Sequence, residues 1–373
     1  ITSSAASDVY KRQALGVVIE NHDERPVKAE GNEKHPTTLG KSNSFAQAST
    51  LEMYDPDRAR GVKFEGNKVD WNEYLKFAKS LNDGNGKGLA VLMQESSSPT
   101  IKSIQEDFKK NLPNADWVVY ESVNNENLYD GIELAFSKRL QPLYRLEKAQ
   151  IIVSLGSDFL GVDDNNIYHT RKFAQNRNIV DENSTMNRLY VAESSISSTG
   201  SSADHRLNIP QYEMENLLAE LAYELKQLGL RIEAKKVKSS NNLWVKAAAK
   251  DLFDGRGESI IIGGSSLSKE FHQLIALINY NLKAPVDYYP LNMSQISSIK
   301  NFESLCNDMK NGKINNLIIL GANPVYDSPV DFDFAESLKK VKNSVHLTSI
   351  IDETSKLCSW NIAMNHYFEC WGD

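Results

Sequence analysis

The fold class follows from residues 151–158, which read Ile151-Ile152-Val153-Ser154-Leu155-Gly156-Ser157-Asp158. Five mainly apolar residues fit a buried β-strand, and the glycine and acidic residue mark the loop that ends it. A helix-like stretch near residues 168–176 comes next. A strand followed by a helix is the repeating element of a parallel α/β sheet.

The same order recurs on both sides of this stretch. Strand-like runs lie at residues 89–93, 117–120, 189–192, 260–262, 317–320 and 345–351. Helix-like stretches follow most of these runs. One of them opens at Ser98-Pro99, where a serine cap and a proline are typical of a helix start. We therefore predict an α/β fold with doubly wound, mostly parallel sheets.

Two further helix-like stretches stand outside this alternation. Asp70 is the expected cap of the first, and its apolar face includes Trp71, Tyr74 and Leu75. Apolar residues repeat with helical spacing over residues 214–228. We interpret this second apolar stripe as core packing.

Composition is that of a globular chain and excludes several classes of protein. The 373 residues include 40% apolar and 24% charged residues, with a formal net charge of -7. Basic residues are scattered, so we expect no nucleic-acid partner. No apolar run approaches the roughly 20 residues of a membrane span. The three cysteines, Cys306, Cys358 and Cys370, lack metal-motif spacing and are interpreted as small buried side chains.

Four loops at predicted strand ends are the candidate ligand-binding segments. They are Gly156-Ser157-Asp158, Glu193-Ser194-Ser195, Gly263-Gly264-Ser265-Ser266 and Gly321-Ala322-Asn323-Pro324. In open α/β sheets, ligands bind where the strands end at their carboxyl side. Glycine lets backbone N–H groups approach a phosphate, and an acidic side chain can hold a ribose hydroxyl. Ordinary turns explain these loops more simply than a nucleotide site does, and none of them fits the dinucleotide-binding glycine pattern.

Other common sites lack their local motifs. The seven histidines show no zinc-ligand spacing, and no Gly-x-Ser-x-Gly elbow follows a strand. The residues alone therefore predict an α/β protein with several strand-end loops and no assigned chemistry.

Three blocks of sequence resemble the molybdopterin oxidoreductase family. Residues 25–36 read RPVKAEGNEKHP, and residues 46–58 contain AQA and YDPDR. Residues 191–207 contain VAES, TG and ADHRL. The third block joins LIILGANPVY at residues 317–326 to DET and HYFECWG within residues 352–372. The resemblance covers about residues 14–373 and is closest to the molybdopterin-oxidoreductase-like B subunit of alternative complex III, a quinol-oxidising membrane assembly.

The departures from the family pattern concern the groups that hold cofactors. The family's N-terminal iron–sulfur cluster needs thiolates, whereas no cysteine precedes Cys306. The position of its last cluster cysteine falls within residues 43–46, which read NSFA. No cysteine that could ligate molybdenum occurs around residues 121–126, and residues 210–213 read PQYE where the family has PGTD.

The resemblance leaves four functions open. The first is a cofactor-free scaffold region of a respiratory, quinol-oxidising iron–sulfur subunit, with no catalysis by this fragment alone. The second is an active molybdopterin-dependent oxidoreductase with a serine or aspartate metal ligand. Its pterin nucleotide would be held by Gly156, Asp158, Glu193, Asp204, Gly321 and Asn323. The third is the iron–sulfur subunit of respiratory NADH dehydrogenase, and the fourth is an unrelated nucleotide-binding α/β protein.

The resemblance also implies an organisation and a location. Residues 1–13 look like a non-native tail, and residues 14–70 form a small N-terminal β region. Residues 71–145 and 240–373 share one α/β unit, into which residues 146–239 insert a second. We expect a fragment of a subunit exported by the Tat route to the periplasmic face of a bacterial membrane. Cytochrome c and quinol-binding membrane subunits are its expected partners, with iron–sulfur clusters beyond Asp373.

Overall fold

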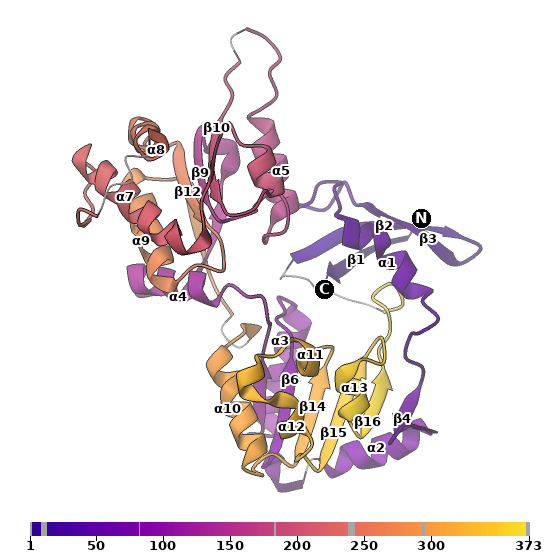
Figure 1. Ribbon diagram of the computed structural model, residues 1–373. Helices are drawn as coiled ribbons and strands as arrows, with labels where there is room; N and C mark the ends of the chain where they lie inside the picture. The colour runs from indigo at the N-terminus through magenta and orange to yellow at the C-terminus, as the bar shows by residue number, and fades with distance from the viewer. Residues whose placement is uncertain are drawn as a thin grey trace. The chain divides into compact units, whose positions relative to one another are not determined.

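The computed structural model describes residues 2–8, 13–81, 83–182, 184–237, 243–292 and 295–370. The chain divides into two compact units (Figure 1). Unit 1 comprises Ile1–Asn124 and Asn292–Asp373, and unit 2 comprises Asn125–Leu291. Among the described residues, no helix combines the length and the apolar character that a membrane crossing requires.

Unit 1 contains a seven-stranded sheet in the order β5-β4-β16-β15-β14-β6-β7. Its strands are β4 (Val62–Phe64), β5 (Asn67–Val69), β6 (Leu89–Met93), β7 (Asp116–Val119), β14 (Asn316–Leu320), β15 (Asn343–Thr348) and β16 (Trp360–Ala363). The five strands from β16 to β7 run parallel, and β4 and β5 add an antiparallel hairpin. Parallel strands are buried on both faces, which explains their nearly continuous apolar runs.

Helices cover both faces of this sheet. They are α2 (Trp71–Ser80), α3 (Pro99–Asn111), α10 (Ile299–Lys310), α11 (Pro324–Asp327), α12 (Phe334–Leu338) and α13 (Glu353–Leu357), with short 3₁₀ turns at Asp83–Gly86 and Val330–Phe332. Leu92 and Ile319 pack in one hydrophobic cluster with Phe302 of α10. Leu89 lies in a different cluster, with the partly buried Phe108 of α3 packed against it. Alternate residues of a strand thus face different helical layers.

The N-terminal part of unit 1 is a small antiparallel sheet in the order β1-β2-β3. Its strands are β1 (Thr2–Asp8), β2 (Gln13–His22) and β3 (Arg25–Gly31), followed by α1 (Ser44–Met53). Val17 and Ile19 on β2 and Ala29 on β3 are buried. The structure pairs residues 2–8, within the expected non-native tail, with β2 as strand β1.

Unit 2 contains a four-stranded parallel sheet in the order β11-β10-β9-β12 and a separate antiparallel pair, β8 with β13. The strands are β8 (Leu140–Tyr144), β9 (Ile151–Leu155), β10 (Arg188–Glu193), β11 (His205–Asn208), β12 (Ser259–Gly263) and β13 (Val286–Pro290). The helices are α4 (Glu126–Phe136), α5 (Asn166–Gln175), α6 (Ser198–Ser201), α7 (Met214–Gln227), α8 (Leu243–Asp254) and α9 (Lys269–Leu282), with 3₁₀ turns at Leu146–Lys148 and Gln211–Glu213.

The parallel sheet of unit 2 is also covered on both faces, with α7 and α8 on one side and α5 on the other (Figure 1). Val153 and Leu155 of β9 pack with Leu221 of α7. Ile152, the residue between these positions in the pleat, packs with Phe173 of α5. The expected α/β class with doubly wound, mostly parallel sheets is confirmed.

The unit boundaries lie elsewhere than the sequence suggested. Residues 243–291, expected with residues 71–145, belong to unit 2 because β12 pairs in parallel with β9, Ile260 facing Ile152. Residues 125–145 join the same unit because β8 pairs with β13. The boundary expected between residues 239 and 240 lies outside the described residues.

Candidate functional site

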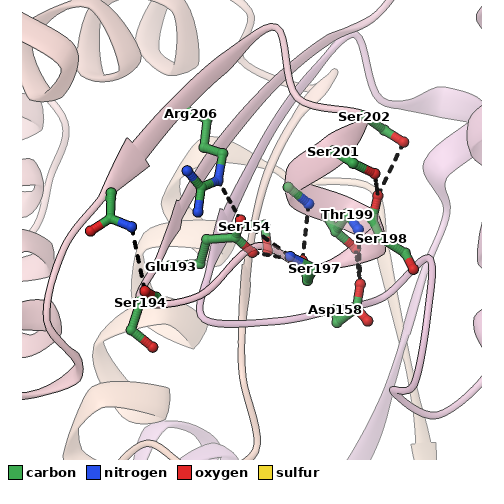
Figure 2. Close-up of polar contacts among 12 residues, drawn as sticks. Ser154, Asp158, Glu193, Ser194, Ser197, Ser198, Thr199, Ser201, Ser202 and Arg206 are labelled. Atoms are coloured by element: carbon green, nitrogen blue, oxygen red, sulfur yellow. Dashed lines mark hydrogen bonds and ion pairs between the residues drawn. The ribbon is translucent and has the colours of Figure 1, made fainter.

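Two predicted acidic residues, Asp158 and Glu193, lie at the carboxyl edge of the parallel sheet of unit 2. Asp158 follows β9, and Glu193 is the last residue of β10. The two strands are parallel neighbours, so their ends meet at one edge of the sheet. Figure 2 shows both side chains beside the short helix α6 and the loop that leads into it.

The carboxylate of Asp158 is bound by Thr199. Oδ1 of Asp158 accepts hydrogen bonds from the backbone N–H and from Oγ1 of Thr199, each at 2.8 Å. Thr199 is fully buried, and its Oγ1 also accepts a hydrogen bond from the Leu160 N–H at 3.0 Å. A Cβ at Gly161 would lie 2.0 Å from Oδ2 of Asp158, so the loop folds closely around this carboxylate.

The carboxylate of Glu193 is equally enclosed. Its Oε2 accepts a hydrogen bond from Ser197 Oγ at 2.6 Å, and its Oε1 pairs with Arg206 Nε at 2.5 Å. Glu193 is buried, and a Cβ at Gly200 would lie 1.8 Å from its Oε1. A buried carboxylate is stable when it is paired and hydrogen-bonded, and here the chain itself supplies the partners (Figure 2).

The two glycine loops at the ends of β9 and β12 touch each other through the backbone. Sheet order places the topological switch point between these strands, where open α/β sheets bind ligands. Gly264 N–H donates to the Leu155 carbonyl at 3.0 Å, and a Cβ at Gly264 would lie 2.0 Å from the Gly156 carbonyl oxygen. Gly156 adopts φ +67° and donates to the Ala192 carbonyl at 2.8 Å. Close backbone packing therefore accounts for Gly264, and the positive φ accounts for Gly156.

Asp204 lies at the opposite, amino-terminal edge of the same sheet. It directly precedes β11, and its Oδ2 accepts a hydrogen bond from the Leu189 N–H at 2.7 Å, near the start of β10. Arg177 Nη2 pairs with the same oxygen at 2.5 Å. Burial raises the pKa of Asp204, but the bonds from Arg177 and Leu189 outweigh it and hold the pKa below its ordinary value. Asp204 therefore does not join Asp158 and Glu193.

Gly321 and Asn323 lie in unit 1, after β14. Gly321 adopts φ +69° and donates its N–H to the Leu347 carbonyl at 2.9 Å. Oδ1 of Asn323 accepts a hydrogen bond from Thr354 Oγ1 at 2.7 Å, and its Nδ2 donates to Glu353 Oε2 at 2.8 Å. These bonds fasten the loop after β14 to α13.

Residues that sequence reasoning did not single out lie beside this loop. Tyr120, at the end of β7, donates its hydroxyl to the Asp327 carbonyl at 2.9 Å. Oδ1 of Asp327 is buried without a hydrogen-bond partner among the described residues. Burial raises the pKa of Asp327 to about 6. Tyr120 ends a predicted strand, but 207 positions separate it from Asp327, so local patterns could not pair them.

The side chains do not fit an iron–sulfur cluster. Within the described part of the chain, no group of three or more histidine, cysteine, aspartate or glutamate residues could hold a metal ion. Cys306 and Cys358 are buried, and burial raises the pKa of each thiol to about 12. Cluster iron binds thiolates, which these environments disfavour.

The first and third signature blocks meet in unit 1. Arg58 forms a two-pronged ion pair with Glu369, with Nη1 to Oε1 at 3.1 Å and Nη2 to Oε2 at 2.7 Å. Arg58 Nη1 also donates to the Met53 carbonyl at 2.9 Å. The pair lines an open cleft of about 530 Å³, together with Tyr54 and Arg60 among others. We call this Arg58–Glu369 pair the terminal ion pair.

Comparison with known proteins shows relatives by structure alone. No family model matches the chain, and no curated protein matches its sequence. Acetylene hydratase from Pelobacter acetylenicus has a similar structure, with a TM-score of 0.68 and 11% identity. That match covers 95% of this chain and 62% of the hydratase chain, so this chain spans less than two thirds of that protein's length.

A second solved structure is similar over most of both chains. It is the formyltransferase/hydrolase complex FhcABCD from Methylorubrum extorquens, crystallised with methylofuran. The TM-score is 0.52 at 10% identity, over 82% of this chain and 87% of the other. At such identities the likeness shows the fold, which is related to that of the molybdopterin oxidoreductases. The two names describe different reactions, so chemistry has to be argued from the side chains.

Proposed function

We propose that this chain is a cofactor-free, molybdopterin-oxidoreductase-like scaffold region of a respiratory electron-transfer subunit, similar to the B subunit of alternative complex III. In this proposal the fold holds the subunit in its assembly and performs no catalysis alone. The fold relation to the molybdopterin oxidoreductases supports the first part. The sequence blocks that meet in the terminal ion pair support the particular subfamily.

One observation carries the proposal: groups of the chain itself already bind the two carboxylates at the carboxyl edge of the parallel sheet of unit 2. A dinucleotide ligand would need free acidic acceptors and a glycine cradle there. Asp158 is instead bonded to Thr199, and Glu193 to Ser197 and Arg206. The close approach of Gly264 to the Gly156 carbonyl explains a glycine at position 264 without a phosphate ligand.

The proposal includes a location and partners. The subunit would face the periplasm of a bacterial cytoplasmic membrane after export by the Tat route. Cytochrome c and quinol-binding membrane subunits would surround it, and its iron–sulfur clusters would lie in the chain beyond Asp373. The absence of any cysteine before Cys306 supports placing the clusters outside this region.

Metal and pterin analysis tests the cofactor-free state. The protein would be produced in a bacterium that makes molybdopterin, beside a known molybdopterin enzyme as positive control. Elemental analysis should find neither molybdenum, tungsten nor iron in stoichiometric amount, and oxidation should release no fluorescent pterin. Stoichiometric molybdenum with pterin would reject the scaffold and favour an active oxidoreductase, with Gly156, Asp158, Glu193, Asp204, Gly321 and Asn323 as the residues to mutate next.

The complete gene and its complex test the respiratory role separately. We expect cysteines in C-x-x-C-x-x-C spacing downstream of Asp373. Purification of the tagged full-length subunit from its own membranes should yield c-type haem and quinol oxidation. A complete gene without such cysteines would reject this role while leaving the fold assignment intact.

A further inference from the structure

Two histidines in unit 2 are buried without hydrogen-bond partners on either ring nitrogen. They are His169 on α5 and His272 on α9, with exposed fractions of 3% and 1%. No described residue meets hydrogen-bond geometry with Nδ1 or Nε2 of either ring, although the Asp164 backbone lies near His169 and the Gly264 backbone lies near His272. An unpaired buried imidazole is stable as the neutral form, whereas its protonated form carries a charge with no counter-ion.

His169 is surrounded mainly by aromatic rings. Its ring centroid lies 5.7 Å from that of Tyr144 on β8, 5.8 Å from Tyr168 and 6.4 Å from Phe159. The Tyr168 hydroxyl is engaged by Arg145 at 2.8 Å. Among the described neighbours, the one acidic residue that acts on the ring is Asp164, through its backbone. Burial lowers the pKa of His169 to about 4.

His272 is enclosed by the backbone of neighbouring elements. A Cβ at Gly131 of α4 would lie 2.5 Å from its Cβ, and a Cβ at Gly263 of β12 would lie 3.2 Å from its Cε1. On its own helix the ring lies beside Phe271, and on α4 the carboxylate next to Gly131, Asp130, is paired with Arg139. Burial lowers the pKa of His272 to about 4.

Unit 1 offers a contrast in His346, which is fully buried but satisfied. Its Nδ1 lies 2.9 Å from Ser355 Oγ, and its Nε2 lies 2.9 Å from the Ala322 carbonyl. Asp352 Oδ1 lies 3.5 Å from Nδ1 and supplies a counter-charge for a protonated ring. Burial lowers the pKa of His346 too, but the Asp352 carboxylate opposes this shift, whereas in the described part of the chain no such carboxylate charge acts on the pKa of His169 or His272.

We propose that unit 2 is an acid-sensitive part of the molecule, which opens more readily in mildly acidic solution because His169 and His272 can bind protons only in the opened state. Opening should affect α5 and α9, because these helices carry the two rings. The two helices cover opposite faces of the sheet that ends in Asp158 and Glu193. This acid sensitivity is independent of the proposed function, because neither ring takes part in the Asp158 and Glu193 pairings that carry that proposal.

Hydrogen exchange measured by mass spectrometry tests the acid sensitivity of unit 2 on the intact chain, at about pH 7.5 and about pH 5. After correction for the intrinsic rate, peptides from Asn166–Gln175 and Lys269–Leu282 should lose protection at the lower pH. Each histidine that binds a proton only on opening raises the opening equilibrium constant by up to about tenfold per pH unit below 6.5. Peptides from Ile299–Lys310 of unit 1 serve as the internal reference.

Variants separate these histidines from other titrating groups. The double variant His169→Phe, His272→Gln should keep the protection of α5 and α9 nearly equal at both pH values. His205→Gln is the matched control, because His205 is an exposed histidine of the same unit and its removal should leave the pH effect unchanged. If the double variant retained the full loss of protection, the proposal would be rejected.

A measurement on the unmodified protein covers the case in which the double variant fails to fold. NMR of the ring protons should show that the rings of His169 and His272 remain neutral from about pH 7.5 to about pH 5. Seven rings that all titrate near the ordinary value would overturn the proposal.

Discussion

At the scale of single residues, Gly264 illustrates how packing explains a residue that looked like part of a phosphate cradle. Gly264→Ala would place a Cβ 2.0 Å from the Gly156 carbonyl oxygen, and a backbone atom yields poorly. We expect the free energy of unfolding to fall by about 1–3 kcal/mol, as for other overpacked sites. Urea unfolding measures it. Gly257→Ala, where a Cβ meets nothing within 4 Å, should lose less, through its φ of +92° alone.

Asp327 carries a pH dependence of its own. Burial raises its pKa in the folded state to about 6, above the ordinary 3.8. The folded state therefore binds its proton more tightly, and this contribution to stability is complete below pH 3.8 and lost as the pH rises through about 6.

Asp327→Asn should remove this dependence. At about pH 7.5 the variant should be more stable by about 1 kcal/mol, a value discounted because solvent reaches part of the side chain. At about pH 4 the difference should vanish. Asp331→Asn, at an exposed neighbouring aspartate, is the control and should change neither value. A variant less stable than the parent at pH 7.5 would contradict the burial argument.

Part of the candidate site could be predicted from the sequence. Strand periodicity and a following acidic residue were enough to place Asp158 and Glu193 at strand ends. Their partners Thr199 and Arg206 were not predictable, because side-chain pairing across a sheet edge depends on register. The position of Asp204 depends on strand register in the same way. Tyr190 lies opposite His205 in the sheet, which puts Asp204 just before β11 at the amino-terminal edge.

At the scale of elements, the sequence predicted helix caps and core strands better than it predicted which face of a helix is buried. Ser98 Oγ accepts from the Ile101 N–H at 3.1 Å, and Asp70 from the Asn72 N–H at 2.8 Å, as their types imply. The buried stripe of α7 is confirmed as core packing. Strands β8 and β13 were missed because they are half-buried, and their pairing joins residues far apart in sequence.

Helix α2 shows why an apolar face could not be read from periodicity alone. The expected face included Trp71 and Leu75, which are 49% and 38% exposed. Tyr74, which was expected, and Phe77, which was not, contact the sheet, and Phe77 stacks on Trp360 with ring centroids 5.1 Å apart. At this place the sheet presents the ring of Trp360 to α2, so aromatic packing decides which face of the helix is buried.

Mutation of Trp360 tests whether α2 packs on the sheet through Tyr74 and Phe77. Trp360→Ala should lower the free energy of unfolding by about 3–5 kcal/mol, because the ring is 6% exposed and touches α2 and β4. Trp71→Ala, on the exposed side of the same helix, should cost less than about 1 kcal/mol. Equal losses in thermal unfolding would show that α2 packs through its other face.

At the scale of the whole molecule, the terminal ion pair joins residues 311 positions apart. Glu369→Gln keeps the shape of the side chain but removes the charge opposite Arg58. Since both side chains are partly exposed, at 19% for Arg58 and 34% for Glu369, we expect a loss of about 1 kcal/mol. Denaturant unfolding at low and high salt measures it. The exposed pair of Lys250 and Asp254 is the control, and Asp254→Asn should be nearly neutral.

The division of the chain also fixes the order in which a ribosome completes the two units. Unit 2 is continuous, whereas the strands of unit 1 are made before and after it. Strand β6 leaves the ribosome without its neighbour β14, and at ordinary synthesis rates it waits on the order of ten seconds or more. During that interval Leu89–Met93 is an unpaired apolar edge, so the nascent chain is a natural client for a chaperone that shields it.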